Sequence, residues 1–166
     1  TPEEVRDIIF EKNKINNKAR LVAGYCWDWK SKKDKTVSDI VIGDFGMRWN
    51  LATDGSLWII APESVTEVGC IHTCQGLEVD YVGVIVGDDF VIRDGKVVTR
   101  PEKRAKTDKS LHGYKKLRAY DQKIADTKAD LIIKNTYRTL MTRGMKGCYV
   151  YFTDDETKGW FKGNLK

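Results

Sequence analysis

The sequence predicts an α/β domain in which helices flank a mostly parallel sheet. Residues 81–86 form an apolar, largely β-branched run, which suits a central strand that is buried on both faces. Residues 129–141 place apolar side chains at the i, i+3, i+4, i+7 spacing of an amphipathic helix. Another apolar run, residues 148–152, follows this helix after two glycines. Strands and helices therefore alternate along the chain.

The first part of the chain predicts a capped helix followed by a strand. Thr1 can cap a helix and Glu4 can complete a capping box, while Asn16 and Asn17 end the helical pattern. The short apolar run at residues 21–26 predicts a buried strand, and the basic stretch at 27–35 predicts a loop.

The middle of the chain predicts short elements separated by turns. Residues 39–42 and 57–60 are expected to be extended, and residues 63–68 to form a helical turn after a proline. Residues 88–128 are predicted to be a hairpin plus a charged insertion. The hairpin turns at Asp94-Gly95, and the insertion is expected to be exposed and helical around residues 114–120.

Length and composition predict a single domain over residues 1–166. The chain begins with Thr1 and enters a helix at once, so we expect a fragment of a longer chain whose N-terminal partner domain is missing. We expect no signal peptide, and no apolar run approaches the ~20 residues that span a bilayer. These features predict a cytoplasmic protein with no membrane partner.

The net charge weakly indicates a polyanionic partner, and the cysteine pattern does not indicate a metal site. The net charge of +5 mildly favours a polyanion such as nucleic acid. Cys70, His72 and Cys74 alternate, but a structural zinc site needs a fourth ligand and none has a matching spacing. We therefore expect free thiols and no metal site.

The segment at residues 72–80, His-Thr-Cys-Gln-Gly-Leu-Glu-Val-Asp, places polar groups between two apolar stretches. Ligands bind at strand ends in open α/β sheets. Gly76 lets a backbone approach a ligand closely, and Glu78 can accept hydrogen bonds from ribose hydroxyls. The side chains of His72, Thr73 and Gln75 can donate to phosphate oxygens of a nucleotide or of a nucleic-acid backbone.

The segment at residues 137–144, Tyr-Arg-Thr-Leu-Met-Thr-Arg-Gly, ends the predicted long helix. Arg143 there suits a phosphate, because the planar guanidinium pairs with two oxygens at once. It equally suits the negative end of the helix dipole, and Lys146 is most simply a charge of the same kind. Trp27 and Lys30, in the basic loop, are further candidates for contact with nucleic acid.

These two segments resemble motifs V and VI of superfamily 1 helicases, in the same order and with a long insertion between them. Most of the chain, residues 19–153, more closely resembles the schlafen-like, group-three DNA/RNA helicase domain family, a largely uncharacterised bacterial group. The resemblance implies a RecA-like fold of the P-loop NTPase superfamily and the role of second motor domain in an ATP-dependent helicase or translocase.

The resemblance also implies residue roles. Arg143 would be the arginine finger that reaches the γ-phosphate of ATP, and Gln75, Gly76 and Glu78 would bind the nucleotide. A strand of DNA or RNA would lie near His72, Thr73, Trp27, Lys30 and Lys146. The motif IV arginine would be Arg20 or Arg48.

One departure from the family pattern is large: the chain has no G-x-x-x-x-G-K-[ST] loop and no convincing acidic Mg²⁺ site. ATP and Mg²⁺ would then be held mainly by an N-terminal RecA-like domain, and neither by residues 1–166 alone. We expect this fragment to be inactive as an ATPase even if the parent protein is an NTPase.

Two alternatives stay open. The first is a non-catalytic nucleic-acid-binding or regulatory module with a helicase-like fold. The second is a Mg²⁺-dependent nuclease, which would require clustering of the carboxylates Asp39, Asp44, Glu63, Glu78 and Asp80.

Overall fold

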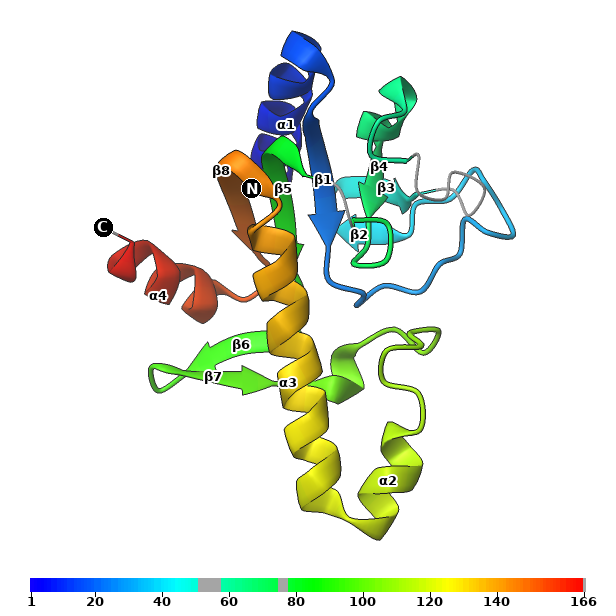
Figure 1. Ribbon diagram of the computed structural model, residues 1–166, viewed down its shortest axis with the longest axis vertical. Coiled ribbons are helices and arrows are strands. Elements are labelled where there is room, and N and C mark those ends of the chain that lie inside the picture. Colours follow the sequence, from blue (N-terminus) through cyan, green and yellow to red (C-terminus); the bar gives the residue numbers. More distant parts are fainter. Residues whose placement is uncertain (51–57, 75–77, 166) are drawn as a thin grey trace.

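The computed structural model describes residues 1–50, 58–74 and 78–165, which contain a six-stranded sheet in the order β2-β3-β4-β1-β5-β8 (Figure 1). The five strands from β3 to β8 in this order run parallel, and only β2 pairs antiparallel with its neighbour. The predicted mostly parallel sheet is therefore correct. The strands are β1 (Ala19–Ala23), β2 (Ile40–Ile42), β3 (Phe45–Trp49), β4 (Glu67–Gly69), β5 (Val79–Val86) and β8 (Gly144–Phe152).

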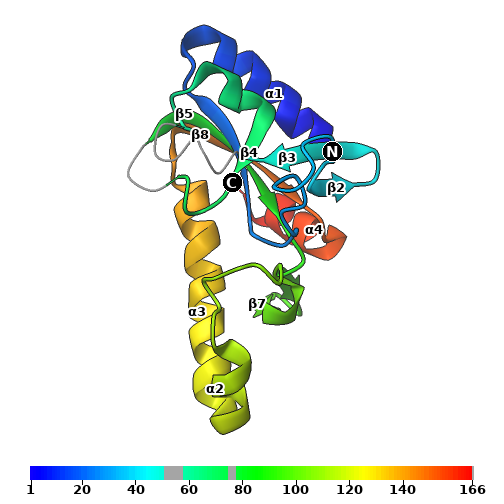
Figure 2. The same cartoon turned by 90° about the vertical axis from the view of Figure 1, so that its right-hand side faces the viewer.

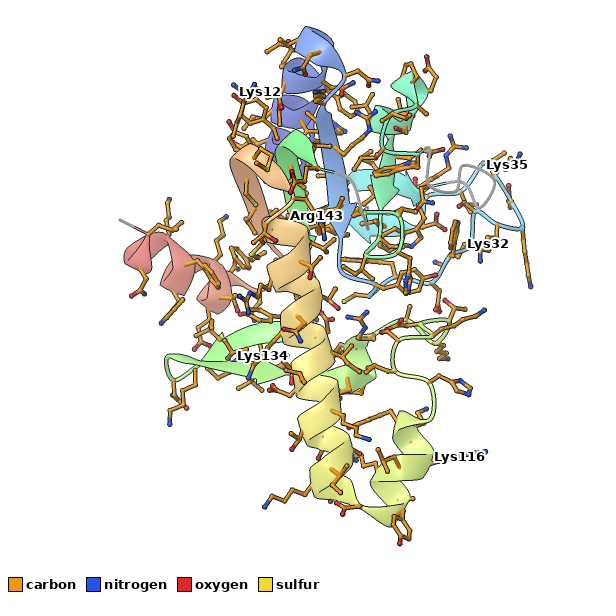
Figure 3. All side chains as sticks on the ribbon, in the orientation of Figure 1. Lys12, Lys32, Lys35, Lys116, Lys134 and Arg143 are labelled. Atoms are coloured by element: carbon orange, nitrogen blue, oxygen red, sulfur yellow. The ribbon has the colours of Figure 1, made fainter. Side chains whose placement is uncertain are left out.

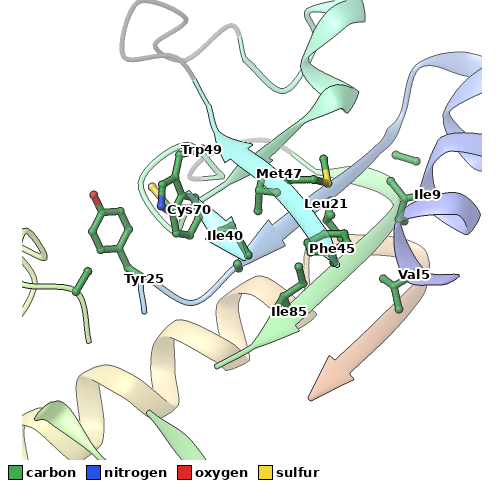
Figure 4. Close-up of a cluster of buried hydrophobic side chains, with 14 residues drawn as sticks. Val5, Ile9, Leu21, Tyr25, Ile40, Phe45, Met47, Trp49, Cys70 and Ile85 are labelled. Carbon is green, nitrogen blue, oxygen red and sulfur yellow. The ribbon is translucent and has the colours of Figure 1, made fainter. Parts of the chain in front are cut away.

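Helix α1 (Pro2–Asn16) covers one face of the sheet. It begins with the predicted capping box, in which the backbone N–H of Glu4 donates to the Thr1 hydroxyl at 3.2 Å. Its apolar side is buried against β1 and β5 (Figure 4). The residues of this contact include Val5, Ile9, Leu21 and Ile85.

Helix α3 (Gln122–Met141) covers the opposite face, where Ile133, Tyr137 and Leu140 are buried with the valines of β5. The predicted helix at 129–141 is confirmed but begins earlier. Asp121 caps it by accepting a hydrogen bond from the backbone N–H of Ile124 at 2.9 Å. Both faces of the sheet are covered, which explains why β5 is apolar along most of its length.

Several predicted elements differ from the structure. The strand predicted at 21–26 is β1, which begins at Ala19 and already ends at Ala23. Gly144 does not stop the helix, which already ends at Met141, but is the first residue of β8. The strand at 148–152 is therefore four residues longer at its start, because pairing with β5 extends to Gly144. Residues 58–60 form a turn rather than a strand, and Leu57 lies outside the described residues.

The predicted hairpin is formed by β6 (Phe90–Arg93) and β7 (Lys96–Thr99). Asp94 and Gly95 at its turn have φ values of 51° and 71°, the left-handed backbone that a two-residue turn requires. The insertion continues through the 3₁₀ turn η3 (Pro101–Lys103) and helix α2 (Tyr114–Tyr120), where a helix was expected.

Two short elements complete the fold. The 3₁₀ helix η2 (Pro62–Thr66) lies before β4, where a helical turn was expected. Helix α4 (Asp155–Asn164), which was not predicted, packs on β8, and Phe161 stacks on Phe152 with ring centroids 4.6 Å apart.

The parallel strands give the sheet two distinct edges. We call the edge where β1, β5 and β8 begin the amino edge, and the edge where they end the carboxyl edge. Helix α3 runs between these edges and continues beyond the sheet, so that its first half lies beside α2 outside the sheet (Figures 1 and 2).

Candidate functional site

Glu78 and Arg143 lie next to each other at the amino edge. Each directly precedes a strand, and these strands, β5 and β8, are parallel neighbours. The backbone N–H of Val79 donates to the carbonyl of Arg143 at 3.1 Å, which fixes the two segments together. The two residues that the sequence assigned to one nucleotide site therefore share one edge of the sheet.

This edge is not the one that the general rule for α/β sheets indicates. Ligands in open parallel sheets bind outside the carboxyl ends of the strands. His72 and Thr73 follow β4 and fit that rule, whereas Glu78 and Arg143 stand at the amino ends of their strands. The fold therefore does not bring these four residues into a single site.

The Arg143 side chain is half-buried at the end of α3 that meets the sheet (Figure 3). Its Nε atom is buried and has no hydrogen-bond partner among the described residues. Burial raises the pKa of the Cys74 thiol to about 12, and the positive charge of Arg143 acts on this thiol in the opposite direction. A buried guanidinium N–H without an acceptor is costly, and a ligand oxygen can satisfy it.

Glu78 is exposed at the same edge, with its carboxylate accessible to a ligand. The other two residues predicted to bind nucleotide, Gln75 and Gly76, lie outside the described residues.

Lys146 also lies at the amino edge and is separated from the other predicted nucleic-acid contacts. Its ammonium pairs with the Asp80 carboxylate at 2.7 Å, and Asn16 donates to the same carboxylate at 2.8 Å. These hydrogen bonds, that from Lys146 first, lower the pKa of Asp80 below its ordinary value.

Arg20, one of the two motif IV candidates, is fully buried at the start of β1. Its guanidinium donates to oxygens of the chain itself, including Ser64 Oγ at 2.8 Å and the Ala61 carbonyl at 2.9 Å. Burial lowers the pKa of Arg20 to about 10. Its guanidinium is occupied by the end of α1 and by η2 with the residue before it, because it also donates to Asn13 and Asn17. Arg48 is only partly buried and donates to the Lys35 carbonyl at 2.8 Å.

A cavity of about 390 Å³ opens at the carboxyl edge, beside the segments that follow β1 and β4. His72 is exposed at this cavity, while the Thr73 hydroxyl is held by the backbone of Cys70 through hydrogen bonds of 2.8 and 2.9 Å. The lining residues are Tyr25, Trp29, Lys32, Asn50, Cys70, His72, Thr73, Thr107, Asp108 and Lys109.

Trp27 and Lys30 lie in the loop after β1, on the same side of the sheet as this cavity. Lys30 is exposed, whereas Trp27 is half-buried against the core and its carbonyl accepts from Trp49 Nε1 at 3.1 Å. The structure thus brings Trp27, Lys30, His72 and Thr73 to the carboxyl edge and leaves Lys146 at the other.

A buried polar network at the carboxyl edge was missed by the sequence analysis. The Tyr137 hydroxyl donates to Asp89, which is fully buried and also pairs with Arg104 at 3.0 Å; Arg104 in turn contacts Asp108 at 2.5 Å. Burial raises the pKa of the Tyr137 hydroxyl well above its ordinary value, so it remains a donor. Arg104 therefore ties the insertion, which was expected to be exposed, to the body.

The signal for this network was present but weak. Asp88 and Asp89 directly follow the apolar run at 81–86, a position where polar groups at the carboxyl edge are expected. Arg104, the partner of Asp89, lies in a segment that composition alone assigns to the surface.

The carboxylates of the nuclease alternative do not gather into a metal site among the described residues. Asp39 instead accepts from Ser31 and from the backbone N–H of Trp49, and Asp80 is paired with Lys146. Over the same described ranges, no helix is long and apolar enough to cross a bilayer.

A parallel sheet with helices on both faces and polar groups at the strand ends defines an α/β domain compatible with a Rossmann or RecA-like fold. Residues 1–154 match the family model described as Schlafen group 3, DNA/RNA helicase domain, and the chain belongs to this family. It is a helicase-like module, from a family whose name indicates interaction with nucleic acid.

One curated relative is the uncharacterized protein YPL245W of Saccharomyces cerevisiae, which is 29% identical over 157 residues. The match covers 92% of this chain but 33% of the yeast protein, so the chain spans about a third of that relative's length. A yeast relative leaves the expected bacterial origin a prediction only. No solved structure matches this chain.

Proposed function

We propose that this chain is the second, RecA-like motor domain of an ATP-dependent DNA or RNA helicase or translocase. One observation carries the proposal: β5 and β8 place Glu78 and Arg143 side by side at the amino edge. Motifs V and VI would thus meet in space as they should in a nucleotide-closing domain. ATP and Mg²⁺ would be bound mainly by the N-terminal RecA-like domain of the same protein.

In this proposal Arg143 is the arginine finger. A guanidinium can donate two parallel hydrogen bonds to phosphate oxygens and neutralise the charge that develops there. The buried Nε atom of Arg143, which has no hydrogen-bond partner in the described part of the chain, would gain an acceptor when the domains close. The exposed Glu78 carboxylate can accept hydrogen bonds from ribose hydroxyls, which would orient the nucleotide at the same edge.

The test uses the full-length protein that contains this domain and measures its ATP hydrolysis. Arg143→Ala should lower kcat about a thousandfold or more, as for other arginine fingers. Arg143→Lys should remain strongly impaired, because an ammonium keeps the charge but lacks the fork. If the charge served only the helix dipole, Arg143→Lys would restore activity and the proposal would be wrong.

Arg138 provides the control, because it is an exposed arginine of α3, the helix that ends just before Arg143. Arg138→Ala should leave kcat within about twofold if only the position of Arg143 is catalytic. Residues 1–166 alone should not hydrolyse ATP. Turnover by this fragment at helicase-like rates, with a loss on Arg143→Ala, would also contradict the proposal.

A second candidate is a non-catalytic nucleic-acid-binding or regulatory module, favoured by the lack of a phosphate-binding loop in this sequence. The sequence of the parent protein outside these residues separates the two. A Walker loop there supports the motor, whereas full-length protein that binds nucleic acid but never hydrolyses ATP supports the module.

A further inference from the structure

The net positive charge of the chain comes from one segment. Residues 100–128 contain ten Lys and Arg against four Asp and Glu, a net charge of +6, whereas the whole chain carries +5. The rest of the chain is therefore close to neutral, with a net charge of −1. Any polyanion that the chain attracts by charge is drawn mainly to this segment.

Much of this segment forms a helical hairpin, which we call the helical arm (residues 114–130). Both views show α2 and the first half of α3 projecting away from the sheet (Figures 1 and 2). The two helices are joined by Asp126, which accepts from the Tyr114 hydroxyl at 2.7 Å and from Arg118 Nε at 3.0 Å. The arm is thus a defined structure with its own internal contacts.

The carboxylates of the helical arm are used within the protein. Asp126 joins the two helices, Asp121 caps α3, and Asp130 pairs with Lys134 at 2.7 Å.

The lysines of the arm differ from these carboxylates. Lys115, Lys116 and Lys123 are exposed and form no ion pair with any residue that the structure describes. Figure 3 shows Lys116 on the side of α2 that faces away from α3. The outer surface of the arm therefore presents uncompensated positive charge.

An exposed aromatic ring lies at the end of the arm. Tyr120 is the last residue of α2, directly before the Asp121 turn, and it is 91% exposed. A single exposed tyrosine is ordinary on a protein surface. Between unpaired lysines, however, an accessible ring is the combination that binds single-stranded nucleic acid, in which lysines contact phosphates and the ring stacks on a base.

A hollow beside α2 extends the same surface. It has a volume of about 580 Å³ and lies between α2 and the loop that follows η3. Its exposed charged or titratable side chains include Lys106, His112, Lys115 and Lys116, with Glu102 as the exposed acid. This hollow offers a path for a backbone of phosphates along the base of the arm.

We propose that the helical arm is a binding element for single-stranded DNA or RNA. Lys115, Lys116 and Lys123 contact phosphates, and the Tyr120 ring stacks on an unpaired base. The helical arm itself is separate from Arg143 and Glu78 at the amino edge, and none of its residues lines the cavity beside His72. It does not depend on ATP hydrolysis, so it stands or falls separately from the proposed motor function.

The test measures binding of residues 1–166 to a fluorescent single-stranded oligonucleotide by anisotropy over a range of salt concentrations. Replacing Lys115, Lys116 and Lys123 together by Gln should lower the salt slope of log K by about 2, because each phosphate contact on a single strand contributes about 0.7. A matched triple variant of Lys96, Lys158 and Lys162 to Gln removes the same charge from exposed positions outside the arm.

The ring is tested separately from the charge. Tyr120→Ala should weaken binding about tenfold, and Tyr120→Phe, which keeps the stacking face, should bind like the original chain. Circular dichroism and thermal unfolding of each variant show whether the fold is retained, as the exposure of these positions predicts.

Three results would overturn the proposal. The arm triple variant could bind like its matched control, or Tyr120→Ala could bind like the original chain. The arm could also bind vesicles of acidic lipid in a manner that these substitutions abolish while oligonucleotide binding remains, which would assign the surface to a membrane instead.

Discussion

The two edges of the sheet carry similar residue types but use them differently. At the carboxyl edge, Asp89, Tyr137 and Arg104 are buried and partner one another. At the amino edge, Glu78 is exposed and Arg143 keeps a buried nitrogen with no acceptor in the described part of the chain. Polar groups that hydrogen-bond to one another stabilise the fold, whereas polar groups without such a partner are available to a ligand.

The largest expected effect is at the carboxyl edge. Asp89→Ala leaves Arg104, whose side chain is 2% exposed, without one of its two carboxylate partners. Removing one member of a buried ion pair costs about 3–5 kcal/mol, so the free energy of unfolding from urea denaturation should fall by that amount. The neighbouring Asp88 is exposed, and Asp88→Ala should cost less than about 1 kcal/mol. Equal effects would contradict the buried network.

The next effect tests how closely α3 packs on the carboxyl edge. A Cβ atom on Gly24 would lie 2.0 Å from the Tyr137 hydroxyl oxygen, so Gly24→Ala should destabilise by about 1–3 kcal/mol through overpacking. Gly159 in α4 has open space around it, and Gly159→Ala should stabilise by about 0.5–1 kcal/mol. Thermal unfolding of both variants compares the two positions, and a neutral Gly24→Ala would show that Tyr137 can move.

The third effect depends on pH and concerns the end of β8. Arg93 donates two hydrogen bonds to Asp154, at 2.5 and 2.8 Å, and lowers the pKa of that carboxyl well below its ordinary value. A lowered carboxyl pKa stabilises the fold above the unfolded pKa of about 4, and this contribution is lost as pH falls. Arg93→Gln should therefore cost about 1 kcal/mol at pH 7.

The direction of the pH dependence shows whether Asp154 is the group responsible. The difference in unfolding free energy between the original chain and Arg93→Gln should remain constant from pH 7 to about 5 and shrink below about pH 4. A difference that grows on acidification would show that another group, and not Asp154, is responsible.

The smallest expected effect on stability is at the amino edge. Arg143→Ala should change the unfolding free energy by no more than about 0.5 kcal/mol, because its Nε forms no hydrogen bond to lose in the described residues. This variant should nevertheless lower kcat for ATP hydrolysis by the full-length protein about a thousandfold or more. A stability loss well above 1 kcal/mol would instead place Arg143 among the groups that hold the fold.

The sequence pattern predicted those helices and strands whose apolar side chains pack in the core. The strand at 81–86 and the helix at 129–141 were found because each buries a long apolar surface. The strand β2 was found only as an extended stretch, and its antiparallel pairing with β3 could not be deduced. Residues 58–60 are apolar enough to suggest a strand, but they form a turn. Trp58 is instead buried in the core cluster that contains the valines of β5.

The candidate site was predictable in its residues but not in its geometry. Glu78 and Arg143 were chosen from motif resemblance, while their adjacency depends on β5 and β8 being neighbours, which no local pattern records. Arg104 was missed for the same reason, because its partner Asp89 lies across a hairpin. Gln75 and Gly76, which lie outside the described residues, remain predictions.

Helix α3 fixes the distance and the angle between the two edges. Tyr137 is anchored at the carboxyl edge, where its hydroxyl accepts from the backbone N–H of Gly87 at 3.0 Å, and Arg143 follows just past the other end of the same rod. One residue inserted between them would rotate everything beyond it by about 100° around the helix axis. The number of residues from Tyr137 to Arg143 thus fixes both the distance and the direction between them. Insertions or deletions in this segment should therefore be tolerated far less than substitutions of its side chains.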